Sequence, residues 1–219
     1  MSMTSTALAE QQLSTAMREG SEAEHDAAEN SDFTVELLAG RINAAGYTAY
    51  LQRLHTVYVA LEDAISARRS DPAVAAVYDP AVERRAALEA DLDHWAPGAP
   101  YDTDSPAATE YAERLRSRDW GGDLLAHHYT RYLGDLSGGQ AIGRILERSF
   151  DLDGAGTAFY AFPDIAKPKP YKDAYRTRLD ELDLSPADKA RVVDEVKVAF
   201  NLNQALFDEL GENLAAYVR

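Results

Sequence analysis

The residue best placed to bind a metal is His25, which stands one helical turn before the acidic residue Glu29. A four-residue step places both side chains on one face of a helix, so the carboxylate can lie beside the imidazole. A histidine oriented in this way can act as a metal ligand. A lone histidine on a helix is more often a surface or core residue, and the spacing alone leaves both interpretations open.

The other histidines argue against a di-iron site. Glu22 and His25 form one Glu-x-x-His step, the unit of ferritin-like di-iron proteins, but that fold needs two such steps. No glutamate stands three residues before any other histidine. His127 and His128 are neighbours that point about 100° apart on a helix, so they cannot comfortably share one metal. The chain has no cysteine, which excludes thiolate metal sites, disulfides and a cysteine nucleophile.

A helical segment between Asp123 and Phe150 contains an unusual number of glycines. Its apolar residues recur at helical spacing, yet each glycine costs roughly 1 kcal/mol relative to alanine in a helix interior. An adjacent glycine pair is also a place where helices kink. The glycines either allow close helix packing or let a bent helix present bare backbone to a flat ligand. Asp135 shares the face of the glycine pair and favours the second interpretation, a ligand pocket with bound water. The glycines are Gly134, Gly138, Gly139 and Gly143.

A cluster of basic residues stands out in an acidic chain. It falls within twelve residues and is interrupted by one acidic residue, Asp173. It is either a solvated surface or a site for an anion, such as the carboxylates of a ligand or an acidic partner. The cluster consists of Lys167, Lys169, Lys172, Arg176 and Arg178.

The elements that position these residues are predicted to be helices throughout. Apolar residues recur every three or four positions, clearly so over 47–65 and 192–214. Three helix starts carry a capping residue before proline, at Asp71, Ser105 and Ser185. Four breaks are predicted, at 70–72, 95–106, 117–122 and 151–170, and aromatic residues in the last indicate a loop that packs on the body. No sustained alternation predicts a strand, so the expected fold class is all-α.

Composition and charge limit the possible functions. The chain has 219 residues, 46% hydrophobic and 27% charged, with a formal net charge of -15. One domain spanning 1–219 is expected, with a flexible tail over about 1–10. The negative charge argues against nucleic-acid binding. No signal peptide or membrane-spanning run is recognisable, so we expect a cytoplasmic monomer without a membrane anchor.

The stretch from Tyr129 to Gln140, Tyr-Thr-Arg-Tyr-Leu-Gly-Asp-Leu-Ser-Gly-Gly-Gln, resembles the signature of the heme oxygenase family at every position. The resemblance extends to 25–29, 57–62, 172–176, 199–204 and 206–210, and covers the chain from about Leu13 to Leu210. It implies a single-domain helical bundle that holds heme between a proximal helix and a kinked, glycine-rich distal helix.

The resemblance also implies roles for individual residues. His25 matches the axial ligand of the heme iron, and Glu29 the carboxylate close to it. Gly134, Gly138 and Gly139 match the kink of the distal helix, and Asp135 the residue that holds water near bound oxygen. Arg18, Tyr129, Lys172 and Arg176 match residues near the heme propionates, Tyr58, Arg131 and Asn203 match a distal polar network, and Phe200 is counted among the heme-binding residues.

The implied reaction opens heme at its α-meso carbon and yields biliverdin, carbon monoxide and ferrous iron. Heme would be substrate and cofactor at once, with O2 as co-substrate and electrons from a ferredoxin or a flavin- or NAD(P)H-dependent reductase. The absence of a membrane anchor and of cysteine motifs resembles bacterial members. One alternative is a heme-binding or heme-delivery protein on the same fold, and another is a helical interaction module. Asp135 favours the enzyme, because binding alone requires no distal residue that orders water.

Overall fold

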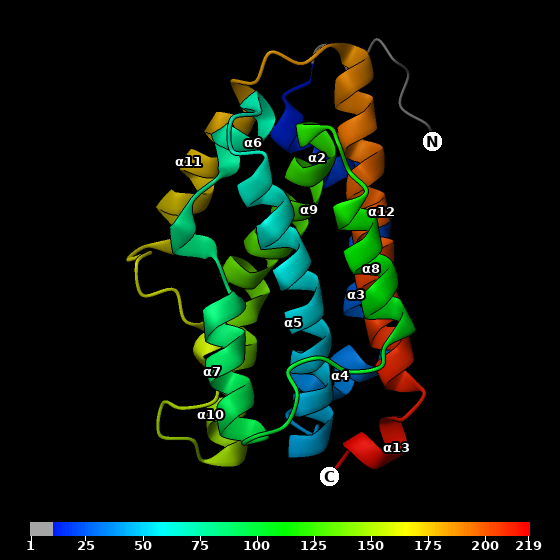
Figure 1. Ribbon diagram of the computed structural model, residues 1–219, viewed down its shortest axis with the longest axis vertical. Helices are drawn as coiled ribbons and strands as arrows, with labels where there is room; N and C mark the ends of the chain where they lie inside the picture. The colour runs from blue at the N-terminus through cyan, green and yellow to red at the C-terminus, as the bar shows by residue number, and fades with distance from the viewer. Residues whose placement is uncertain (1–10) are drawn as a thin grey trace.

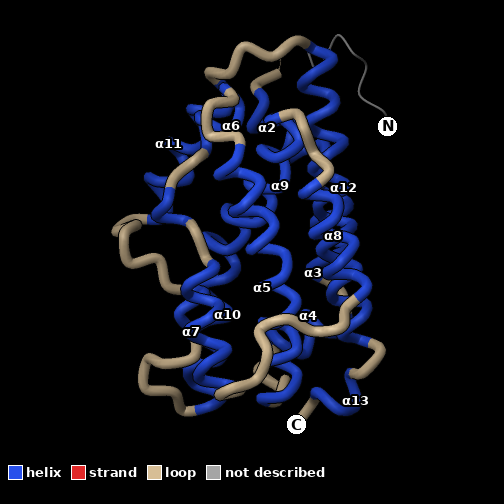
Figure 2. Tube along the Cα trace, in the orientation of Figure 1, coloured by secondary structure: helices blue, strands red, loops and turns tan. Residues whose placement is uncertain are grey.

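The computed structural model describes residues 11–219, and the predicted flexible tail lies outside these described residues. Figure 2 shows helices joined by loops along this part of the chain. No strand occurs within residues 11–219, where the only β-type contact is an isolated bridge between Ile42 and Val218. The all-α prediction is therefore confirmed.

The helices follow one another along the chain, with the longest connections before α8 and before α11. In chain order they are α2 (Leu13–Gly20), α3 (Glu22–Glu29), α4 (Asp32–Leu38), α5 (Ala44–Ala67), α6 (Pro72–Val77), η1 (Pro80–Val82), α7 (Arg85–Trp95), α8 (Pro106–Arg116), α9 (Gly121–Gly134), η2 (Asp135–Gly139), α10 (Gln140–Phe150), η3 (Ala158–Tyr160), α11 (Pro168–Asp180), α12 (Pro186–Gly211) and α13 (Leu214–Tyr217). The predicted breaks at 70–72, 95–106 and 117–122 fall at helix boundaries, whereas the break predicted at 151–170 contains η3 and the start of α11.

The predicted helix starts are capped as the sequence indicates. The side chain of Asp71 accepts from the backbone N–H groups of Ala73 and Val74, at the start of α6. Ser105 and Ser185 cap α8 and α12 in the same way. Each cap satisfies N–H groups that have no partner within the helix.

The N-terminal helical segment is divided in two. Ser21 leaves the helical conformation with φ −119° and separates α2 from α3. Its hydroxyl donates to the carbonyl oxygen of Met17 at 2.8 Å. The break separates α3, which carries His25, from α2.

Two buried apolar clusters hold the helices together. The larger one surrounds α5, which packs against α7 and α8 and runs through the middle of Figure 1. The smaller one joins α2, α6, α9, α11 and the N-terminal half of α12. The long helix α12 contributes to both clusters and packs against α9, α3 and α4.

The glycine-rich segment is a single continuous helix, here called the distal helix (Gly121–Phe150). It consists of α9, the π-helical turn η2 and α10, and Gly134, Asp135, Gly139 and Gln140 all have right-handed helical dihedral angles. A π-helical turn is one of the identifiable causes of a helix kink. The turn contains Asp135 and the glycine pair, so the local distortion lies where the sequence concentrates its glycines.

A search of the described helices for a candidate bilayer span finds none, because none combines sufficient length with sufficient hydropathy.

Candidate functional site

A pocket of about 350 Å3 lies between the distal helix on one side and α2, α3, α4 and α12 on the other, with further lining residues from α5, η3 and α11. This volume is in the usual range for small-molecule and cofactor sites. Its lining combines apolar and aromatic side chains and glycines with an almost equal number of polar and charged side chains. The lining residues are Arg18, His25, Ala28, Glu29, Thr34, Leu38, Tyr50, Tyr129, Thr130, Arg131, Leu133, Gly134, Asp135, Ser137, Gly138, Gly139, Ile142, Tyr160, Arg176, Phe200, Asn203 and Phe207.

His25 enters the pocket from α3. Its side chain is 48% exposed, and its ring meets the ring of Phe200 edge-on at 5.5 Å between centroids. Nε2 lies 3.5 Å from a carboxylate oxygen of Glu29, and Nδ1 lies 3.5 Å from one of Asp26. A carboxylate beside one imidazole nitrogen can orient the ring so that the other nitrogen is available to a ligand.

The glycines of the distal helix leave room in the pocket. A Cβ atom added to Gly134 or Gly138 would meet nothing within 4 Å, so both positions face open space. Any larger residue at these two positions would extend into the space that a ligand needs. At Gly139 an added Cβ would lie 3.2 Å from Cδ1 of Tyr160, which makes this contact tight. The open space beside Gly134 and Gly138 fits a flat ligand that approaches the backbone closely.

Asp135 lies at the centre of a buried polar network. The hydroxyl of Tyr58, on α5, donates to Oδ2 of Asp135. Arg131 donates from Nε to the Tyr58 oxygen at 3.2 Å and from Nη1 to Oδ1 of Asn203. Nη2 of Arg131 lies 3.8 Å from Oδ1 of Asp135. The network thus connects the distal helix to α5 and α12.

Burial dominates the electrostatics of this network. It raises the pKa of Asp135 above its ordinary value, although the Arg131 charge and the Tyr58 hydroxyl act in the opposite direction. Burial also raises the pKa of Tyr58 well above its ordinary value. Tyr58 therefore remains a proton donor at neutral pH, and the Asp135 carboxyl takes up a proton more readily than an exposed aspartate.

Positive charge gathers at one edge of the pocket. Arg18, Arg176 and the phenol of Tyr129 line it, and burial raises the pKa of Tyr129. Lys172 lies just outside the lining and donates from Nζ to the hydroxyl of Ser137 at 2.7 Å. Guanidinium and ammonium groups at this edge suit a ligand with carboxylates.

The structure brings the predicted site residues together from seven helical elements. Twelve of the fourteen line the pocket. The exceptions are Tyr58, which lies behind Asp135, and Lys172, which contacts Ser137 from outside. Sequence reasoning missed Thr34 and Leu38 on α4, which carry no motif. It also missed Tyr160, although its place in an aromatic loop predicted to pack on the body was a signal.

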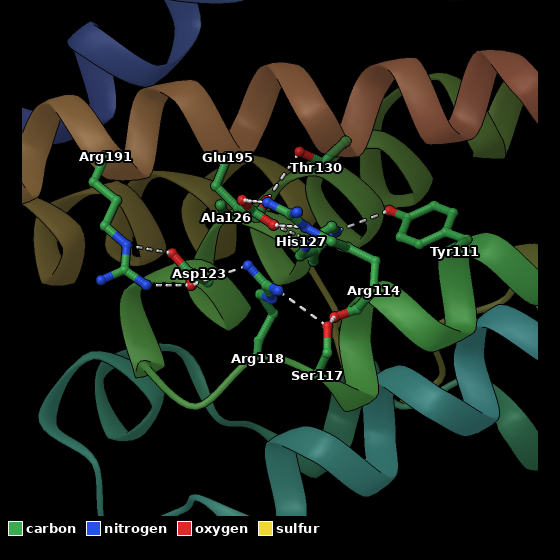
Figure 3. A network of polar contacts seen from close by, with 10 residues as sticks. All are labelled: Tyr111, Arg114, Ser117, Arg118, Asp123, Ala126, His127, Thr130, Arg191 and Glu195. Atoms are coloured by element: carbon green, nitrogen blue, oxygen red, sulfur yellow. Dashed lines mark hydrogen bonds and ion pairs between the residues drawn. The ribbon is translucent and has the colours of Figure 1, made fainter.

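The remaining buried histidines have structural partners. Figure 3 shows His127 between Tyr111 and Glu195, with Nε2 2.9 Å from a glutamate oxygen. His128 pairs with the hydroxyl of Tyr175 at 2.9 Å, and burial lowers its pKa to about 3. Within residues 11–219 no group of three or more His, Asp or Glu side chains could hold a metal ion. The contacts of His127 and His128 are thus hydrogen bonds to different partners on different helices.

The fold and the site together define a helical protein with a pocket suited to a flat, anionic ligand. The heme oxygenase family model matches residues 11–209. The chain is 41% identical to human heme oxygenase 1 over 214 residues, which cover 93% of this chain and 73% of the human protein. It is 36% identical to heme oxygenase 1 of Synechocystis, over 92% of this chain and 86% of that protein.

Solved structures agree with the sequence comparisons. The crystal structure of Synechocystis heme oxygenase-1 in complex with heme matches with a TM-score of 0.89 and 34% identity, over 94% of this chain and 95% of that one. Heme oxygenase from Leptospira interrogans matches with a TM-score of 0.87 and 34% identity, over 91% and 100% of the two chains. The chain therefore belongs to the heme oxygenase family, and it is a heme oxygenase enzyme.

Proposed function

We propose that heme is the substrate of this pocket and that His25 is its axial ligand. Arg18, Arg176, Tyr129 and, from just outside, Lys172 would hold the propionates. The main support for this proposal is that one pocket combines a half-exposed histidine, two glycines facing open space and a basic edge. The heme in the similar Synechocystis structure supports the proposal.

When bound, heme supplies the iron at which oxygen is reduced and the porphyrin ring that is opened. His25 binds through one ring nitrogen while Glu29 or Asp26 orients the imidazole from the other. Gly134 and Gly138 let the backbone lie close to the porphyrin face and exclude bulk water there.

Asp135 holds and moves the proton that the reaction needs. Its carboxyl is buried, has a raised pKa and accepts a hydrogen bond from Tyr58, so it can order water in the pocket and exchange protons with it. Asn203, on α12, accepts a hydrogen bond from Arg131 of the distal helix and so fixes the network from the other side. Asp135 acts through water and does not itself ligate iron.

The reaction consumes O2 and electrons from an external donor, a ferredoxin or a flavin- or NAD(P)H-dependent reductase. We propose opening at the α-meso carbon, which gives biliverdin, carbon monoxide and ferrous iron, because the basic edge orients the propionates. The one-domain organisation, monomeric state and cytoplasmic location stay predictions.

A heme titration tests the ligand. Hemin added to the protein should give a Soret band of a histidine-ligated complex, and His25→Ala should lose that spectrum. Added imidazole should restore it in the variant, because the pocket beside His25 is open. His55→Ala is the matched control, since His55 contacts Glu89 and lies outside the pocket lining. An unchanged spectrum in the His25 variant would remove this residue as the ligand.

A further inference from the structure

Two buried charges outside the pocket hold the turn η3. The carboxylate of Asp91 accepts from the backbone N–H groups of Ala158 and Phe159, at 2.7 and 2.8 Å. The guanidinium of Arg84 donates to the carbonyl oxygens of Phe159 and Ala161. Asp91 is 0% and Arg84 5% exposed. Because these charges pair with the backbone of η3, this turn is held in one position against α7.

Tyr160 ends this turn and contacts the distal helix. A Cβ added to Gly143 would lie 3.0 Å from Cβ of Tyr160, and one added to Gly139 would lie 3.2 Å from its Cδ1. The Cβ atom and the ring of the tyrosine therefore occupy space that only glycine leaves free. The two glycines lie four residues apart and thus on one face of the helix. One of them, Gly139, belongs to the π-helical turn that carries Asp135.

The ring of Tyr160 makes this contact, and its hydroxyl does not. The hydroxyl is buried and forms no regular hydrogen bond among residues 11–219. A phenylalanine could therefore keep the packing, and it would remove a buried hydroxyl that faces the buried hydroxyl of Tyr47.

We propose that Tyr160 is a positioning residue for the distal helix: its ring, held through η3 by Arg84 and Asp91, sets the position of the π-helical turn above the bound substrate. This position decides which edge of the porphyrin the helix shields and where Asp135 holds its water. The proposal rests on the proposed function, because it concerns the orientation of the reacting ring.

The contact can be perturbed from either side. Gly143→Ala adds a methyl group that the tyrosine must avoid, while the helix itself favours alanine. Tyr160→Ala removes the ring, and Tyr160→Phe keeps it. Gly211→Ala is the matched control, because an added Cβ at this helical glycine meets nothing within 4 Å.

Two measurements report on the helix position. The first is the ratio of biliverdin isomers, separated by chromatography after turnover. The second is amide hydrogen exchange over residues 134–143, measured without added heme and again with heme bound. Hydrogen exchange can be measured without ring opening. If the proposed function fails, this measurement therefore still tests whether Tyr160 positions the helix.

In Gly143→Ala and Tyr160→Ala we expect the share of minor biliverdin isomers to rise about tenfold. A displacement of reacting groups by about 1 Å can change a reaction rate about 100-fold, so a shift of the helix on this scale is sufficient for such a change. Both should also speed exchange over 134–143. Gly211→Ala should match the wild type in both measurements, Tyr160→Phe should shift them far less than Tyr160→Ala does, and Asp91→Asn should shift both in the direction of Tyr160→Ala. Unchanged isomer ratios and exchange in Gly143→Ala and Tyr160→Ala would overturn the proposal. So would a Tyr160→Phe variant that behaves like Tyr160→Ala, since the hydroxyl would then be responsible.

Discussion

Asp135→Ala should leave the fold and heme binding largely intact while it stops ring opening. The variant removes the acceptor of the Tyr58 hydroxyl, whereas Arg131 keeps its hydrogen bonds to Tyr58 and Asn203. Loss of a hydrogen bond to a charged acceptor costs about 1.5–3 kcal/mol. Burial disfavours the charged form of Asp135 and raises its pKa, so removing this carboxyl offsets part of that cost. We therefore expect a loss of about 1–2 kcal/mol in the free energy of unfolding.

The effect on turnover should be much larger. Proton transfer by a positioned side chain contributes about 10²–10⁴-fold, so ring opening should slow by at least about 10²-fold, or roughly 3 kcal/mol in the barrier. Heme affinity should change by less than about threefold, because the variant leaves His25 and the basic edge of the pocket untouched. This limit lies below a tenfold change, which corresponds to about 1.4 kcal/mol of binding free energy. The assay follows decay of the Soret band and growth of biliverdin absorption after reductant is added in air.

Asp123→Ala provides the matched control. Asp123 is also buried on the distal helix, but it pairs with Arg191 and lies outside the pocket lining (Figure 3). This variant should lose stability and still open heme at the rate of the wild type. Biliverdin formation at the normal rate in Asp135→Ala would refute the role of Asp135. An equal loss in both variants would show that general destabilisation is the cause.

Three further predictions concern the pocket, the product and stability. Gly138→Leu should fill the pocket and lower heme affinity about 10–100-fold in a hemin titration, with an unchanged Tm. Arg176→Ala should still bind heme but split the product among biliverdin isomers separated by chromatography, and a single isomer would argue against the propionate clamp. Burial raises the pKa of Glu195, but hydrogen bonds from His127 and Arg114 outweigh it and hold the pKa at about 2, against an ordinary value of 4.5. Because the folded-state pKa is lowered, the ionised carboxylate contributes about 3 kcal/mol above pH 4.5, and this is lost as pH falls toward 2. Glu195→Gln should remove that pH dependence in urea unfolding measured between these values.

Local sequence patterns predicted the distal wall of the site well. The signature from Tyr129 to Gln140 lies on one helix, so its spacing alone determines which residues share a face. The glycine pair and Asp135 therefore fall where the sequence indicates. Helix starts at proline were equally predictable, because a cap depends only on neighbouring residues.

Contacts between distant segments could not be predicted from one sequence. Leu38 and Thr34 line the pocket because α4 packs against α12 and α10, and no residue pattern in the sequence encodes that packing. The contact of Tyr160 with Gly143 depends on the path of the loop, which Arg84 and Asp91 hold from another helix. Such placement is set by packing and buried hydrogen bonds over long sequence distances.

The central claim is that this pocket binds heme through His25 and opens it. The most direct measurement adds hemin to the wild-type protein, supplies a reductant in air and records absorption spectra over time. The account predicts a Soret band that forms and then decays as biliverdin absorption grows. A Soret band that persists with a ferredoxin, a flavin-dependent reductase and a chemical reductant would contradict the claim of ring opening, and the absence of any Soret band would contradict heme binding.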